Sequence, residues 1–185
     1  PLGSLRAVFG DNFFYMLHHN EPGGIAEKEY DSDVRGILKR LYTSPDTPRE
    51  DPEVTDPHKS AGGWLKRLGE PKEMPKWLLQ EDLDYLVYQF EKAGFKGGVN
   101  YYRNLDTNWE ITKDIEDLKI KVPTLFVSGK DDMVIRGASA EELKTSMKDH
   151  VEKLEDVVLF PGIGHWVQQE EPEKTNEALL KFLEN

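Results

Sequence analysis

The sequence contains no cysteine. This absence excludes disulfide bonds, thiolate metal sites and a cysteine nucleophile, and it is typical of proteins that work in a reducing compartment. We therefore expect a cytoplasmic protein. The 185 residues are enough for one ordinary domain with its own hydrophobic core.

The chain also lacks long apolar runs and clusters of basic residues. No segment approaches the roughly 18 apolar residues that cross a bilayer, and the N-terminus has no signal-peptide core, so we expect no membrane partner. The net charge is -11, with Lys and Arg dispersed among Asp and Glu. A protein that neutralises phosphates needs a basic surface, so we expect no nucleic-acid partner either.

Histidines are few, and their spacing does not indicate a metal site. His18 and His19 are adjacent, so on a helix their side chains would point about 100° apart. No acidic residue is spaced to complete a ligand set with them or with His58. We expect surface histidines and no bound metal. The glycine pairs are not phosphate loops, because none is followed by the required Lys and Ser or Thr.

The first part of the chain has the pattern of a helical region. Apolar residues at three- and four-residue intervals predict one helix over residues 26–42 and a second from Leu79 to a stop at Gly94. Residues 45–63 are rich in proline and acidic residues, which indicates an excursion over the surface. Residues 1–112 are therefore expected to form a mostly helical region.

The remainder, residues 113–185, alternates between strand and helix. The pattern predicts a buried strand over 120–127, a helix over 140–147, a strand over 157–160 and a final helix that begins at Pro172. This order is typical of a parallel sheet in the α/β class. Two strands leave both edges of such a sheet unpaired, so we expect this region to be part of a larger fold.

Polar loops follow both predicted strands. Gly129-Lys130-Asp131-Asp132 follows the first, and a glycine-rich loop that ends in His165 follows the second. Parallel sheets place functional groups just past the carboxyl ends of their strands, so an aspartate and His165 are expected to meet there. The carboxylate would accept the Nδ1 proton and orient the histidine as a general base. Asp131 and Asp132 both fit this orienting role.

These two loops, the helix between them and the last helix resemble the C-terminal end of α/β-hydrolase-fold enzymes. Asp132 stands three residues after Gly129 and matches the acid of that family, while His165 matches its closing histidine. By this resemblance the residues that flank the acid and the base line the substrate pocket: Met133, Val134 and Trp166.

The earlier part of the chain resembles the lid of epoxide hydrolases. The similarity lies in three stretches: Phe13-Phe14-Tyr15, Asn20-Glu21-Pro22-Gly23 and the run from Gly94 to Asn104 that contains Tyr101-Tyr102-Arg103. Two lid tyrosines in that family donate hydrogen bonds to the epoxide oxygen, and Tyr15 and Tyr102 match them. Only the motif register separates Tyr102 from Tyr101. The resemblance therefore implies a lid at 1–112 and the C-terminal part of a hydrolase core at 113–185.

The resemblance also implies a reaction. An aspartate would attack a small-molecule epoxide to form an ester, the two tyrosines would hold the oxygen, and His165 oriented by Asp132 would activate water to release a vicinal diol. No metal or organic cofactor is implied. The family's nucleophile and oxyanion donors precede the matched region, so we expect the isolated chain to be inactive and to need the N-terminal half of the hydrolase core as a partner.

Two alternatives remain open at the level of sequence. A dehalogenase of the same fold would share the aspartate and histidine roles, but it would hold a halide with tryptophan, histidine or arginine in place of two tyrosines. A non-catalytic hydrolase-fold module would bind a small apolar ligand or another protein, and it would need no nucleophile.

Overall fold

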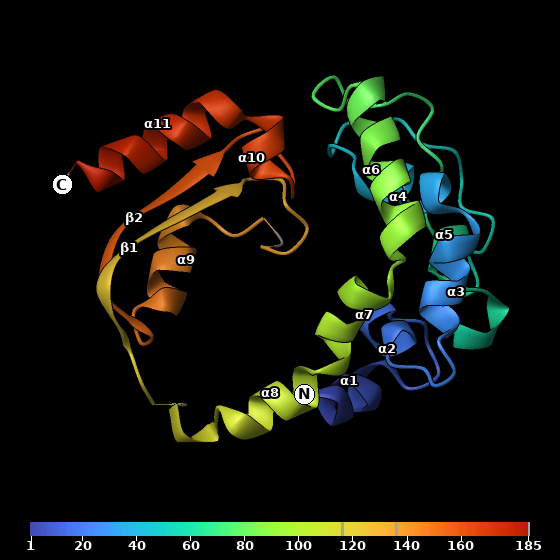
Figure 1. Ribbon diagram of the computed structural model, residues 1–185. Coiled ribbons are helices and arrows are strands. Elements are labelled where there is room, and N and C mark those ends of the chain that lie inside the picture. The colour runs from blue at the N-terminus through green and yellow to red at the C-terminus, as the bar shows by residue number, and fades with distance from the viewer. Residues whose placement is uncertain (116, 136, 185) are drawn as a thin grey trace. The chain divides into compact units, whose positions relative to one another are not determined.

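The structure is a computed structural model that describes residues 1–115, 117–135 and 137–184 (Figure 1). The chain forms two compact units. The first consists of Pro1–Tyr42 and Pro48–Asp114, and the second of Thr43–Thr47 and Ile115–Asn185. The described part of the first unit is helical, while the second contains both strands.

The helical unit is built from short helices around one apolar core. Its elements are α1 (Leu2–Phe9), α2 (Tyr15–His19), α3 (Ile25–Ser32), α4 (Val34–Leu41), α5 (Trp64–Arg67), α6 (Gln80–Ala93), α7 (Lys96–Arg103) and α8 (Leu105–Ile111), with 3-10 helices at Lys59–Ala61 and Lys113–Ile115. Buried side chains of α3, α4, α6 and α7 make up most of the core. They include Tyr30, Ile37, Leu83, Val87 and Val99.

Helix α6 follows the apolar spacing that predicts it. Leu83 and Val87 are buried, and the helix ends at Gly94, whose φ of 67° is a left-handed conformation that glycine adopts without steric cost. Leu79, which we expected on the buried face, lies before the first turn and is exposed. The predicted helix and its stop are confirmed, with a start one residue later than expected.

The single helix predicted over residues 26–42 is wrong, because the chain forms two helices there, α3 and α4. They are separated by Asp33, which has a non-helical backbone with φ of -147°. The Asp33 carboxylate accepts a hydrogen bond from the backbone N–H of Gly36 at 2.9 Å. An aspartate that caps a helix in this way satisfies an N–H that has no partner within the helix, so it favours a new helix start over continuation.

The surface excursion predicted over residues 45–63 is confirmed for the part that belongs to the helical unit. Most side chains from residue 49 to 62 are exposed. The backbone of this segment is held by pairing with the chain near α5: Glu50 donates to the carbonyl of Glu70 at 2.8 Å, and Val54 donates to that of Lys66 at 3.0 Å.

The second unit alternates between strand and helix: β1 (Ile120–Gly129), α9 (Ala140–Met147), β2 (Val151–Phe160), α10 (Val167–Glu170) and α11 (Pro172–Leu183). The two strands are parallel, and Gly129 pairs with Phe160, so their carboxyl ends are level. Helix α9 contacts β2, α11 contacts β1, and the two helices lie on opposite sides of the strands (Figure 1). The predicted parallel pair is confirmed.

Strand β2 begins at Val151 and not at Val157, where the apolar run begins. The residues between them are mostly polar and exposed. Backbone N–H and C=O groups form a ladder whatever the side chains are, so the pairing with β1 extends the strand beyond its apolar part. Pro172 lies in the first turn of α11, as expected.

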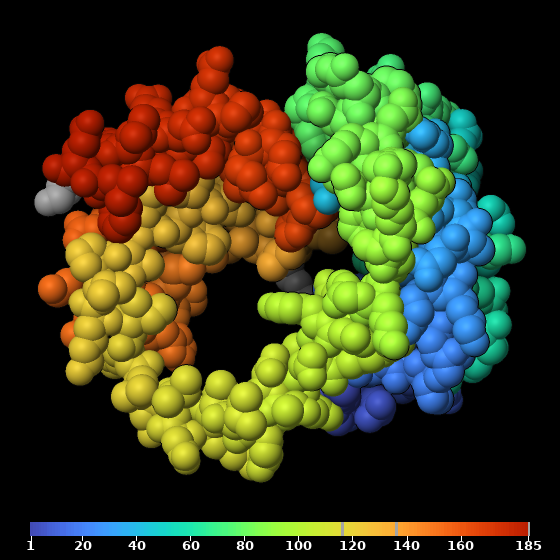
Figure 2. All heavy atoms as spheres, in the orientation of Figure 1, coloured from blue at the N-terminus to red at the C-terminus, as the bar shows by residue number. Residues whose placement is uncertain are grey.

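Apolar side chains remain exposed on this unit. In α11 they are Leu179, Leu180 and Leu183, and in β1 they are Ile120 and Val122. The side chains of α11, in red, form part of the surface of this unit in Figure 2. Exposed apolar side chains grouped on a helix and on a strand are typical of a surface that packs against other protein.

Candidate active-site residues

The loop that follows β1 holds Asp132 in a fixed position. Asp132 is only 8% exposed. Its Oδ1 accepts a hydrogen bond from the backbone N–H of Val134 at 2.9 Å, and its own N–H donates to the carbonyl of Gly129 at 3.3 Å. A carboxylate tied to its own loop in this way has little freedom to change its orientation.

His165, on the loop that follows β2, lies beside this carboxylate. Its Nδ1 is 3.1 Å from Oδ2 and 3.2 Å from Oδ1 of Asp132. The imidazole is 54% exposed, whereas the carboxylate beneath it is buried. With Nδ1 donating to the carboxylate, Nε2 is the nitrogen that can accept a proton, and this is the geometry of an oriented general base.

The neighbouring Asp131 makes different contacts. Its Oδ2 accepts from the backbone N–H of Gly162 at 2.8 Å, and its own N–H donates to the carbonyl of Ile163 at 3.0 Å. Asp131 therefore ties the loop after β1 to the loop after β2, while Asp132 contacts the imidazole. The structure thus brings Asp132, and not Asp131, against the imidazole, and the orienting role of Asp132 stays a prediction.

Glycine allows these two loops to approach closely. A Cβ atom on Gly129 would lie 2.2 Å from the carbonyl oxygens of both Ile163 and Gly164, which is closer than any side-chain carbon can come to backbone. Gly162 has φ of 78°, a left-handed conformation that L residues rarely adopt. The close packing of the loops, and with it the contact between Asp132 and His165, therefore depends on glycine at these positions.

Glu170 is a further residue of this site, and our sequence analysis missed it. Its carboxylate accepts hydrogen bonds from the backbone N–H groups of Gly164 at 2.9 Å and Trp166 at 3.0 Å, the residues on either side of His165. It thus holds the backbone that carries the imidazole. A glutamate five residues after a candidate base is a weak signal, because such a residue is usually a solvated helix side chain.

The three residues expected to line a pocket differ in their surroundings. Met133 is 82% exposed and Val134 is 66% exposed. The Trp166 ring is partly buried and packs edge-on against the His165 ring, with the ring centres 5.2 Å apart. A role for these three side chains in substrate binding stays a prediction.

In the helical unit, Tyr15 and Tyr102 come together from distant parts of the chain. Tyr15 is the first residue of α2 and Tyr102 lies in α7. Their ring centres are 5.6 Å apart with the planes at 83°. Tyr15 also stacks on Trp64 at 4.9 Å. Tyr101 is 72% exposed, so the structure brings Tyr102 against Tyr15 and leaves its neighbour at the surface.

The helices that carry the two tyrosines are tied together by side-chain hydrogen bonds. Asn20 donates through Nδ2 to the carbonyl of Tyr102 at 3.2 Å, and Arg103 donates through Nε to the carbonyl of His19 at 3.0 Å. Both terminal nitrogens of Arg103 also reach the Glu27 carboxylate, at 2.7 and 2.6 Å. Such a bidentate pair is rigid, and the Arg103 guanidinium lowers the pKa of the Glu27 carboxyl.

Burial favours the protonated form of both phenols. It raises the pKa of Tyr15, with a smaller contribution from the nearby Tyr102, and it also raises the pKa of Tyr102. A phenol whose pKa lies above its ordinary value of about 10 remains a hydrogen-bond donor throughout the neutral range. The two side chains are therefore chemically suited to donate to an oxygen that gains negative charge.

The expectation that His18 and His19 are surface histidines is wrong, although His58 is exposed as expected. His19 is 3% exposed, and its Nε2 lies 2.9 Å from the Tyr30 hydroxyl. His18 pairs through Nε2 with Oε2 of Glu29 at 2.6 Å. Both partners lie eleven residues along the chain, in α3, so local spacing alone does not predict the burial.

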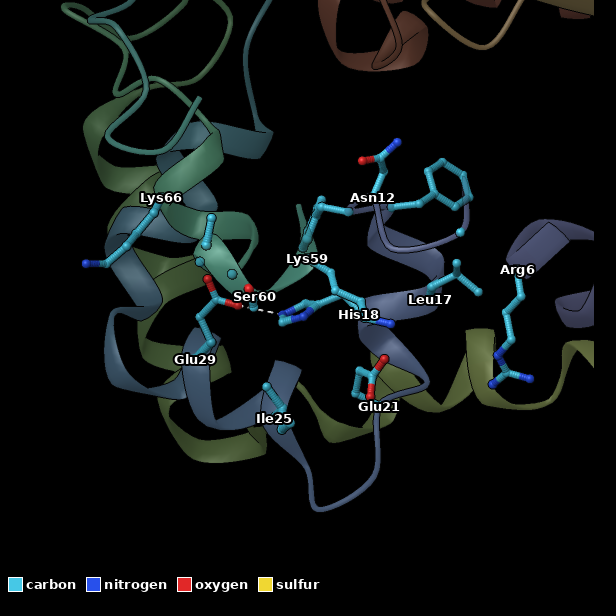
Figure 3. Close-up of a pocket in the computed structure, with 16 residues that line it drawn as sticks. Arg6, Asn12, Leu17, His18, Glu21, Ile25, Glu29, Lys59, Ser60 and Lys66 are labelled. Carbon is cyan, nitrogen blue, oxygen red and sulfur yellow. Dashed lines mark hydrogen bonds and ion pairs between the residues drawn. The ribbon is translucent and has the colours of Figure 1, made fainter. Parts of the chain in front are cut away.

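The pair of His18 and Glu29 borders a groove of about 750 Å³ in the helical unit (Figure 3). Leu17 and Ile25 contribute apolar surface to the groove, and Lys59 contributes a cation. Tyr15 and Tyr102 are not among the residues that line it. Within the described ranges, no three His, Cys, Asp or Glu side chains are grouped so as to hold a metal ion.

Comparisons with known proteins place the chain in a family. Residues 85–181, just over half of the chain, match the model of the dienelactone hydrolase family. Epoxide hydrolase A of Mycobacterium tuberculosis is 37% identical over 99% of the chain, and epoxide hydrolase 1 of Siraitia grosvenorii is 36% identical over 99%. The chain spans about half the length of these curated relatives, 56% in both cases.

Solved structures give the same result. The crystal structure of epoxide hydrolase A from Mycobacterium thermoresistibile matches all of the chain with a TM-score of 0.84 at 37% identity, and the chain covers 56% of it. Potato epoxide hydrolase I matches 98% of the chain with a TM-score of 0.77 at 32% identity, and again 56% of that structure is covered.

These matches define the second unit as part of an α/β-hydrolase fold and confirm the fold class expected from the sequence. The chain belongs to the dienelactone hydrolase family, and over its whole length it is a relative of the α/β-hydrolase-fold epoxide hydrolases, as its sequence motifs indicate. Among the described residues, no helix is both long and apolar enough to cross a membrane.

Proposed function

We propose that the protein to which this chain belongs is an epoxide hydrolase, which converts small-molecule epoxides to vicinal diols. The observation that carries the proposal is the meeting of Tyr15 and Tyr102, from α2 and α7, in a chain whose relatives are named epoxide hydrolases. Paired phenol donors suit a reaction that builds negative charge on an oxygen atom. A dehalogenase of the same fold would be expected to hold its halide with tryptophan, histidine or arginine in place of two tyrosines.

In the proposed reaction, a carboxylate attacks one carbon of the epoxide and the C–O bond of that carbon breaks. The bond electrons go to the ring oxygen, which accepts hydrogen bonds from Tyr15 and Tyr102 and then a proton from one of them, so that this phenol becomes a phenolate. The product of this step is an ester between the carboxylate and the opened alcohol. Because both phenols remain protonated at neutral pH, they are ready to donate when the oxygen becomes charged.

In the second step, Nε2 of His165 takes a proton from a water molecule, and the resulting hydroxide attacks the ester carbonyl. The ester bond breaks, the alkoxide leaving group takes the proton of the new carboxyl group, and the diol leaves. The carboxylate is thereby regenerated, and the proton held by the imidazolium returns through water to the phenolate formed in the first step. Asp132 holds the Nδ1 proton and stabilises the imidazolium that forms, as its contacts of 3.1 and 3.2 Å support. Side chains and water are sufficient for every step of this scheme, so it uses no metal or organic cofactor.

The proposal assigns residues 1–112 to the lid and 113–185 to the C-terminal part of the hydrolase core. The attacking aspartate and the donors that stabilise the tetrahedral intermediate would come from an N-terminal half of the core outside these 185 residues. The length of the relatives supports this assignment, since the chain covers 56% of them. The exposed apolar side chains of α11 and β1 are also suited to packing against further strands and helices.

The proposal is tested with two tyrosine variants of the whole protein, Tyr102→Phe and the matched control Tyr101→Phe. Each removes one hydroxyl, but the control removes it from an exposed side chain. We expect Tyr102→Phe to lower kcat for styrene oxide by about 10²–10³-fold, the usual loss for one donor to a developing oxyanion, while the control stays near the parent. Equal rates in the two variants would contradict the role of Tyr102.

The parent protein also decides the reaction itself. Diol formation from styrene oxide, followed by chromatography, supports the proposed function. Halide release from a haloalkane without diol formation would instead establish the dehalogenase. The 185-residue chain alone is expected to form no diol above the uncatalysed rate, because removal of the nucleophile abolishes a covalent mechanism. Addition of the N-terminal half should restore part of the activity.

A further inference from the structure

His19 lies at the centre of a cluster of aromatic rings in the helical unit. Four rings surround its imidazole, with centre-to-centre distances of 4.5 Å to Tyr102, 5.5 Å to Trp64, 5.6 Å to Tyr15 and 5.7 Å to Tyr30. The imidazole is therefore in contact with both of the phenols that the proposed reaction uses. Any rotation of the imidazole would move the surfaces against which those two rings pack.

One polar contact determines the orientation of this imidazole. Nε2 of His19 lies 2.9 Å from the Tyr30 hydroxyl, while Nδ1 is buried without a hydrogen-bond partner among the described residues. Tyr30 is itself 2% exposed and belongs to the core of the unit. A buried polar atom without a hydrogen-bond partner costs about 1–3 kcal/mol of folding stability. We therefore expect the histidine at this position to have a function that offsets the cost.

We infer that His19 is a positioning residue for Tyr15 and Tyr102: the Tyr30 hydroxyl holds the imidazole at one angle, and the imidazole holds the two phenol rings at theirs. The inference rests on the proposed function, because it assigns His19 to the same site. His19 acts through the phenols and does not touch the substrate.

The chemistry of imidazole explains why a purely apolar ring would serve less well. A phenylalanine fills nearly the same space, but it has no atom that bonds to Tyr30, so only packing would fix its orientation. Two phenols that donate to the same oxygen must be placed within a fraction of an ångström, because a misplacement of about 1 Å can cost on the order of 10²-fold in rate. A directional hydrogen bond supplies that precision.

Three variants of the whole protein test the inference: His19→Phe, His19→Gln and Tyr30→Phe. Phenylalanine preserves the ring shape at position 19 and removes the hydrogen bond, whereas glutamine loses the ring but places an amide nitrogen near the former Nε2. We expect His19→Phe and Tyr30→Phe each to lower kcat for styrene oxide by about tenfold with little change in KM, since the phenols act chiefly in the transition state. His19→Gln should retain more of the kcat than His19→Phe.

A packing role for His19 predicts the opposite order, with His19→Phe closest to the parent and His19→Gln the more damaged. That order would overturn the inference. The double variant adds a second criterion: when the two residues act through one hydrogen bond, His19→Phe combined with Tyr30→Phe is no slower than either single variant. Multiplied losses would contradict a shared action. Tyr30→Phe leaves the imidazole in place, so it remains informative if His19→Phe fails to fold.

A readout without substrate separates this inference from the proposed function. In the protein labelled with ¹³C-tyrosine, the ring signals of Tyr15 and Tyr102 should shift in Tyr30→Phe, which keeps every ring of the cluster and removes only the hydroxyl that orients the imidazole. The exposed Tyr101 provides the internal control. A parent that forms no diol would refute the proposed function alone, whereas unchanged Tyr15 and Tyr102 signals in Tyr30→Phe would refute the positioning role.

Discussion

Replacement of His19 with phenylalanine should remove a specific pH dependence from the stability of the helical unit. Burial lowers the pKa of His19 to about 4, with further lowering by His18 and Arg103 and partial opposition from Glu27 and Glu29. In the unfolded chain the same imidazole takes up a proton near its ordinary value of 6.5. The unfolded state therefore binds more protons than the folded state between these two values.

The sign and the size of the effect follow from this difference. Because the folded-state pKa of His19 is depressed, the free energy of unfolding falls as the pH falls from 6.5 toward 4. Below pH 4, His19 is protonated in both states and contributes no further pH dependence. One pKa unit corresponds to about 1.4 kcal/mol, so the full window amounts to about 3 kcal/mol, of which about 2 kcal/mol lies between pH 7 and pH 5. Carboxylates with lowered pKa values, such as Glu29, contribute mainly below this interval.

The measurement is urea unfolding followed by tryptophan fluorescence, since Trp64 packs against His19. The free energy of unfolding is determined at pH 7 and at pH 5 for the parent and for His19→Phe. We expect the loss between the two pH values to be about 2 kcal/mol smaller in the variant. His150→Phe, the same change at an exposed position, is the control and should keep the parental loss. A loss in His19→Phe equal to that of the parent would refute the reasoning.

Two further changes test the α/β unit. Asp132→Asn should lower kcat by about 10²–10⁴-fold, because the amide no longer stabilises the imidazolium of His165, and the ester intermediate should accumulate and be detectable by mass spectrometry. The matched control is Asp131→Asn, which retains an acceptor for the N–H of Gly162. Equal losses of kcat in the two variants would contradict the role of Asp132. Gly129→Ala should destabilise this unit by about 1–3 kcal/mol, since the added Cβ would overlap two carbonyl oxygens. The measurement is thermal or urea unfolding. An unchanged unfolding midpoint would show that the loops after β1 and β2 can move apart at no cost.

Much of the fold was predictable because several elements are specified by residues near to one another in sequence. Helix α6 has apolar residues on one face and a glycine at its end, and α11 begins with Pro172. The errors occurred where one polar side chain decided the outcome. Asp33 divides residues 26–42 into two helices, because its side chain caps the second one. The spacing of apolar residues carries no information about such a side-chain hydrogen bond, so it does not predict the break.

The candidate site was predictable to a different extent in each unit. The meeting of Asp132 and His165 follows from two strands whose carboxyl ends are level, but the choice between Asp131 and Asp132 required coordinates. The burial of His19 had no local signal, since it depends on Tyr30, eleven residues away in another helix. Contacts of this kind are set by how helices pack, and a single sequence carries little information about them.

Glu170 holds the backbone on both sides of His165, so the residues that support the imidazole lie close together in the sequence. The segment from Ile120 to Glu170 carries the imidazole, its carboxylate partner and the backbone contacts that hold both. In the proposed reaction, the residues assigned to water activation thus lie in one part of the chain, and the two tyrosines assigned to ring opening lie in the helical unit. The hydrogen bonds of Asp132 and Glu170 that orient His165 therefore lie within the second unit, and the folding of that unit brings these three residues together.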